Sequence, residues 1–102
     1  MAMTIRLQTE VGEKIGEVYD TQGVIVTHLP PLSDESYHCV RFIDPYGDTY
    51  FNEMQIETFL AEWNCIFGKV EELEAKRLSA EINALAQRCK QEPHLYLKFL
   101  GD

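Results

Sequence analysis

The stretch Arg41–Phe67, RFIDPYGDTYFNEMQIETFLAEWNCIF, predicts a turn, a strand and the start of a helix in immediate succession. Its residues 44–47, DPYG, are typical of a type I turn, because Asp favours the first position, Pro the second and Gly the last. We expect this turn to close a hairpin with a bulge at Gly47. The hairpin would pair a strand over residues 36–43 with a strand around Tyr50.

The same stretch predicts a capped helix after the hairpin. Asn52 is a favoured N-cap residue, and Gln55 lies three positions later, where a capping box places its second side chain. From there, apolar residues recur at spacings of three and four, which indicates a helix with one buried face. They are Ile56, Phe59, Leu60, Trp63, Ile66 and Phe67. We interpret Trp63 as an anchor of the core, the alternative being a ring that stacks on a ligand.

The helical pattern beyond Phe67 allows two readings. One unbroken helix over 53–91 is compatible with the spacing, and so are two helices separated at Gly68. Acidic residues over 71–74 would suit the N-terminus of a second helix, and Arg88 would suit its C-terminus. We favour two helices.

Alternation of apolar and polar residues predicts the strands. The segments 3–11 and 14–19 alternate, 24–27 is a β-branched run, and 94–100 follows Pro93 with alternate apolar positions. The predicted fold is a single α+β domain. It has an antiparallel five- or six-stranded sheet, made of a meander, then two helices packed on one face, then a C-terminal strand beside the first strand or in the middle of the sheet.

Charge and cysteine content narrow the classes of partner. Seventeen Asp and Glu against nine Lys and Arg give a net charge of −8. That balance disfavours nucleic acids and anionic membranes as partners. Three widely spaced cysteines, Cys39, Cys65 and Cys89, argue against a disulfide framework, and no apolar run is long enough to span a bilayer. We expect a cytoplasmic protein.

No catalytic or metal-binding pattern stands out in the sequence. Neighbouring His38 and Cys39 would point to opposite faces of the predicted strand, and Cys65 and Cys89 lie on helix stripes. The cysteines are also too far apart for the paired ligands of a structural zinc site. We therefore predict a protein that is not an enzyme and that has no cofactor and no metal.

The candidate binding residues gather around the predicted turn. They are Arg41, Asp44, Tyr46, Asp48, Tyr50 and Glu53. Tyrosines are favoured in protein interfaces, and an arginine on an apolar strand face pairs with a carboxylate, binds a ligand or extends to water. The first expectation is a small acidic protein-interaction or inhibitor-like module that binds another protein, a basic one by charge, or forms a homodimer. The alternative is a ligand- or cation-binding domain that uses the acidic turn 44–53, although its spacing is not that of a calcium loop.

Overall fold

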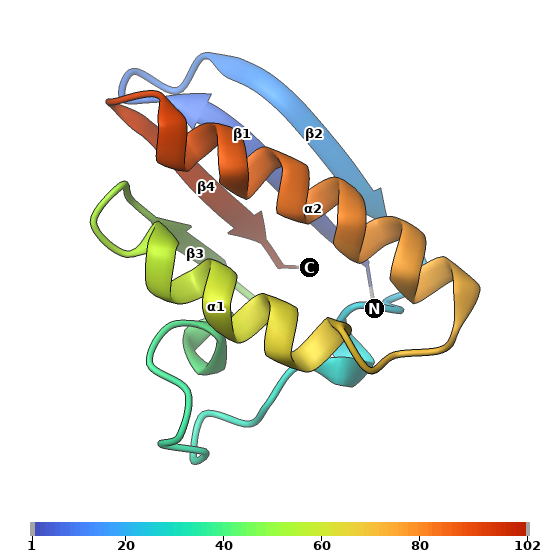
Figure 1. The fold of residues 1–102 in the computed structure, drawn as a ribbon. Helices are drawn as coiled ribbons and strands as arrows, with labels where there is room; N and C mark the ends of the chain where they lie inside the picture. The colour runs from blue at the N-terminus through green and yellow to red at the C-terminus, as the bar shows by residue number, and fades with distance from the viewer. Residues whose placement is uncertain (1, 102) are drawn as a thin grey trace.

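The chain folds into a four-stranded antiparallel sheet with two helices, in a computed structural model that describes residues 2–101 (Figure 1). The predicted α+β class is confirmed, whereas the predicted five or six strands are wrong. The strands are β1 (Met3–Thr9), β2 (Lys14–Asp20), β3 (Asp48–Phe51) and β4 (Leu95–Leu100), the helices are α1 (Ile56–Phe67) and α2 (Leu73–Gln91), and two single 3-10 turns are η1 (Val26–His28) and η2 (Val40–Phe42).

The sheet has the strand order β2-β1-β4-β3, with every neighbouring pair antiparallel. The last strand, β4, therefore lies between the first strand and β3, as predicted for so apolar a terminal segment. Ile5 of β1 is paired with Val18 on one side and with Phe99 of β4 on the other. Because side chains alternate along a strand, this register collects the apolar residues of four strands on one face.

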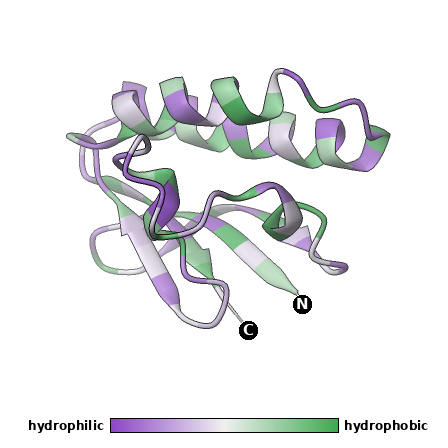
Figure 2. Cartoon of the chain, turned by 90° about the horizontal axis from the view of Figure 1, so that it is seen from below, coloured by the Kyte–Doolittle hydropathy of each residue, from purple (hydrophilic) through white to green (hydrophobic). Residues whose placement is uncertain are grey.

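Both helices cover that apolar face and leave the other face of the sheet without a helix (Figure 2). The buried strand residues that face the helices are Met3, Ile5, Leu7, Val18, Phe51, Leu95, Leu97 and Phe99. From α1, Trp63 stacks on Phe59 with ring centroids 5.2 Å apart, and Phe59 in turn lies 5.0 Å from Phe51. The predicted role of Trp63 as a core anchor is confirmed.

The helical region is two helices. Backbone hydrogen bonding of α1 ends at Gly68, whose N–H donates to Asn64 O at 2.9 Å, and α2 begins at Leu73. The predicted capping-box bonds are present in the turn over 53–55 that leads into α1, where Asn52 Oδ1 accepts from the Gln55 N–H and Gln55 Oε1 accepts from the Asn52 N–H. Within residues 2–101, neither helix is long and apolar enough to cross a membrane.

The predicted strand over 24–27 is wrong, because the chain turns there instead. The buried carboxylate of Asp20, at the end of β2, accepts the backbone N–H groups of Val24 and Ile25, each at 2.8 Å. Donors bonded to a carboxylate are not free to pair with a neighbouring strand. The β-branched run therefore bends into η1, and Ile25 is inserted into the core.

The predicted hairpin across the DPYG turn is also wrong. Residues 36–43 form a loop that contains η2, and β3 pairs with β4 alone among the described strands, with Tyr50 opposite Lys98. The turn itself is present, because the Gly47 N–H donates to Asp44 O at 3.4 Å. The expected bulge at Gly47 is absent. Gly47 is not among the residues with positive φ within 2–101, which are Gly12, Gly23 and His94.

Candidate functional site

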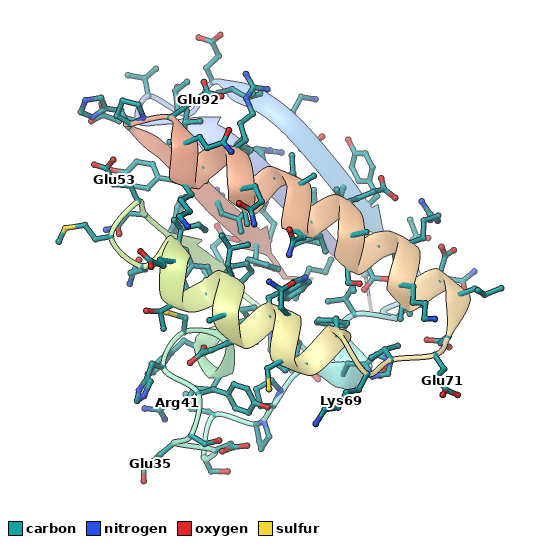
Figure 3. The ribbon with its side chains drawn as sticks, viewed as in Figure 1. Glu35, Arg41, Glu53, Lys69, Glu71 and Glu92 are labelled. Atoms are coloured by element: carbon teal, nitrogen blue, oxygen red, sulfur yellow. The ribbon has the colours of Figure 1, made fainter. Side chains whose placement is uncertain are left out.

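The six residues predicted as a site do not come together. Asp48 and Tyr50 lie on β3 on the face of the sheet opposite the helices, and Tyr46 is exposed at the tip of the turn. Figure 3 shows Glu53 beside the start of α1 and Arg41 in the loop that runs below that helix. The acidic turn is therefore divided among separate surfaces.

No cation-binding arrangement of these side chains is seen within residues 2–101. Asp44 accepts from the Tyr46 N–H within its own turn, Asp48 lies 3.6 Å from Lys98 Nζ, and Asn52 caps α1. Within residues 2–101, no group of three or more His, Cys, Asp or Glu side chains is arranged to hold a metal ion. One oxygen each of Asp44, Asp48 and Asn52 is used in these contacts.

Burial makes two of the three thiols poor nucleophiles. Burial raises the pKa of Cys39, and the nearby Glu62 carboxylate adds to this effect. Burial also raises the pKa of Cys89 to about 11. A thiol whose pKa is raised is mostly protonated at neutral pH, and the thiolate is the reactive form. Cys39 and Cys89 are thus packing residues, and Cys65 is exposed on α1.

The face of the sheet opposite the helices is the first candidate surface, and we call it the open face. It consists of the outward residues of all four strands, which are Thr4, Arg6, Gln8, Lys14, Glu17, Tyr19, Asp48, Tyr50, Tyr96, Lys98 and Leu100. Tyr19 is 58% exposed and Tyr50 is 48% exposed. Three tyrosines therefore surround a polar centre on a broad surface.

The centre of the open face holds two cations side by side. Arg6 and Lys98 are direct partners in the register of β1 and β4. Arg6 Nε donates to Glu17 Oε2 at 2.7 Å, toward β2. Lys98 Nζ lies 4.9 Å from the centre of the Tyr50 ring, toward β3. Like charges on opposing residues destabilise a sheet, so each cation is held by a partner on its outer side.

Glu17 is the hub of the polar contacts on β2. Its carboxylate accepts hydrogen bonds from the Tyr19 hydroxyl, from Arg6 and from Lys14 Nζ. Donation by Tyr19 and by Arg6 lowers the pKa of Glu17 to about 2. A β-bulge between Leu7 and Gln8 in the β1–β2 register brings Lys14 to the same face as Glu17. These contacts hold the outer edge of the open face in one arrangement.

A cavity in the loop beside α1 is the second candidate surface, and we call it the loop cavity. Its volume is about 550 Å³. It is lined by Val26 and residues 29–32 from one segment and by residues 41–45 from another. Arg41 and Asp44, both predicted as site residues, lie in its wall, and the tyrosines do not. The predicted ion pair of Arg41 is not seen within residues 2–101. Its Nη1 instead donates to Leu32 O at 2.7 Å, and its Cζ lies 4.3 Å from the centre of the Phe42 ring.

Glu62, which the sequence did not single out, holds one wall of the loop cavity in place. Its carboxylate accepts from the backbone N–H groups of three consecutive residues, His38, Cys39 at 2.9 Å and Val40 at 3.0 Å. Burial acts to raise the pKa of Glu62, but these three donors outweigh it and lower the pKa. The residue therefore fixes the segment that leads into Arg41.

Acid should remove the stabilising contribution of Glu17. A carboxyl whose folded pKa of about 2 lies below its usual 4.5 stabilises the fold fully above pH 4.5, and this contribution is lost as the pH falls toward 2. The free energy of unfolding of the native chain should thus exceed that of Glu17→Gln at pH 7, and the gap should narrow below pH 4.5. Urea denaturation of both chains across this range measures it. A difference in the free energy of unfolding that does not change with pH would contradict the lowered pKa of Glu17.

Glu62→Gln should destabilise the fold, because it removes a charge and one of the two oxygens that accept three N–H groups. Hydrogen bonds to a charged acceptor contribute about 1.5–3 kcal/mol, and we expect a loss of that order in the free energy of unfolding. Glu57→Gln, at an exposed position in the first turn of the same helix, is the control and should cost at most about 1 kcal/mol, the range for a charge at a helix N-terminus. Equal effects of the two changes would refute the role given to Glu62.

Comparison with known proteins finds no matching family model, no similar curated protein and no similar solved structure. The properties that bear on function are those of the two surfaces described above. The open face is broad, rich in tyrosine and centred on two cations. The loop cavity is smaller, concave and mainly apolar, with one arginine and one aspartate in its wall.

Proposed function

We propose that the chain is a non-enzymatic protein-interaction module that binds an acidic segment of another protein through the open face. The observation that carries this proposal is the cross-strand pair Arg6 and Lys98 at the centre of a tyrosine-bearing sheet face that no helix covers in the described part of the chain. Tyrosine and arginine are among the residues that contribute most often to binding energy at protein interfaces.

The side chains of the open face are already held in place before a partner arrives. Arg6 and Tyr19 both donate to Glu17, and Lys98 lies against the Tyr50 ring. Binding then loses less side-chain freedom than it would with mobile residues, since each immobilised long side chain costs about 0.5–1.5 kcal/mol. Tyrosine rings also offer large contact area with few rotatable bonds. Such preorganisation favours recognition.

The charge of the open face favours an acidic partner, whereas the net charge of the whole chain favours a basic one. The open face carries three cations, Arg6, Lys14 and Lys98, against two carboxylates, Glu17 and Asp48, although the whole chain has net charge −8. Partners bind with complementary potentials, so this face suits carboxylates placed beside apolar side chains. A second copy suits it less well, because a two-fold axis at its centre would bring Arg6 and Lys98 against the same cations of the other copy.

The proposal is tested with two short peptides that share one apolar pattern and differ in charge. One carries Glu and the other Lys at the polar positions, and each is titrated into the ¹⁵N-labelled chain at low salt, where charge complementarity is least screened. We expect the acidic peptide to bind and to shift the amide resonances of β1 and β4. Tighter binding of the basic peptide would contradict the proposal.

A matched pair of lysine variants tests whether the open face is the binding surface. Lys98→Gln removes a cation of this face, and Lys69→Gln removes an exposed cation of the loop between the helices. Losing a charge-assisted hydrogen bond should weaken binding of the acidic peptide about tenfold for Lys98→Gln, while Lys69→Gln binds as the native chain does. Equal weakening by both variants would mean non-specific attraction and would refute the assignment.

A further inference from the structure

We infer that the loop cavity is a binding site for a small carboxylate with an apolar body, which pairs with Arg41. The site is independent of the open face, because the segments that line it, Val26 with 29–32 and 41–45, contain no strand of the sheet. Its volume of about 550 Å³ lies within the usual range of ligand pockets. Most of its wall is apolar and includes Val26, Leu29, Pro31 and Ile43.

Arg41 supplies the positive charge of this cavity and has donors to spare. Nη1 donates to Leu32 O, whereas the buried Nε has no hydrogen-bond partner within residues 2–101. A guanidinium can present its donors in pairs to a carboxylate, and a buried donor without an acceptor is unfavourable. The Phe42 ring, 4.3 Å from Cζ, keeps the guanidinium plane in position. A ligand carboxylate in the cavity would accept from the guanidinium donors that Leu32 O leaves free, and the Arg41 side chain would turn to bring Nε to it as well.

The rim and the wall of the cavity indicate the rest of the ligand. Leu32 is 60% exposed and Phe42 is 48% exposed, so the entrance is apolar as well. Asp44 is the acidic residue of the lining, and its Oδ1 accepts from the Tyr46 N–H at 2.8 Å. An anion is repelled by Asp44 and attracted by Arg41, so its carboxylate belongs at the Arg41 side and its apolar body along the proline and leucine side chains.

Three probes of the same shape test this inference. They are 4-phenylbutyrate, its neutral amide and 4-phenylbutylamine, each titrated into the full chain while the ¹⁵Nε–H resonance of Arg41 is followed. We expect saturable binding of the carboxylate, with a downfield shift of the Arg41 Hε signal, and at least tenfold weaker binding of the amide. Equal affinity for the amide, tighter binding of the amine, or no movement of the Arg41 signal would overturn the assignment.

Two variants with opposite expected effects on affinity separate a loss of binding from a folding defect, because a folding defect cannot strengthen binding. Arg41→Gln should weaken 4-phenylbutyrate binding at least tenfold, and Asp44→Asn, which keeps the oxygen that accepts from Tyr46, should strengthen it severalfold. Arg77→Gln is the matched control, because Arg77 lies on α2 and pairs with Glu74. It should leave the affinity unchanged. A failure of Asp44→Asn to strengthen binding, or a loss with Arg77→Gln, would refute the site without bearing on peptide binding by the open face.

Discussion

The packing of Trp63 is the interaction on which the rest of the structure depends. Its indole lies 5.2 Å from the Phe59 ring, 4.3 Å from that of Phe67 and 6.0 Å from that of Phe99 on β4, while Nε1 donates to Ser79 O of α2 at 3.1 Å. One side chain thereby joins both helices to the sheet, with its polar atom satisfied. Because the helices are held on this side, no helix covers the other face of the sheet in the described part of the chain.

Elements with strong local periodicity could be predicted from sequence, and the loop between β2 and β3 could not. The first two strands, both helices and the last strand carry their own alternation or stripe. The segments 24–27 and 36–43 also look extended, yet their N–H groups are taken by Asp20 and by Glu62. The residues whose backbone N–H groups donate to Glu62 lie more than twenty positions away in the sequence. No local pattern therefore reveals the contact.

The candidate binding residues could be predicted from local sequence, whereas their contacts with distant parts of the chain could not. Arg41 could be picked out as a cation on an apolar segment and Asp44 as the first residue of the turn, and both line the loop cavity. Tyr50 could be picked out as a tyrosine among the acidic residues around the turn, but its contact with Lys98 could not, because the two meet only through the register of β3 with β4. Strand order decides which polar residues meet, and alternation within one strand carries no information about strand order.

Hydroxyl-radical footprinting of the free chain tests most directly whether the helices cover one face of the sheet and leave the other to solvent. We expect rapid modification of Tyr19 and Tyr50, and slow modification of Trp63 and Phe99, which are almost completely buried. Trp63 is intrinsically the most reactive of these rings, so its protection would be decisive. Trp63 oxidised as fast as Tyr50, or Tyr19 and Tyr50 protected in the monomer, would contradict the account.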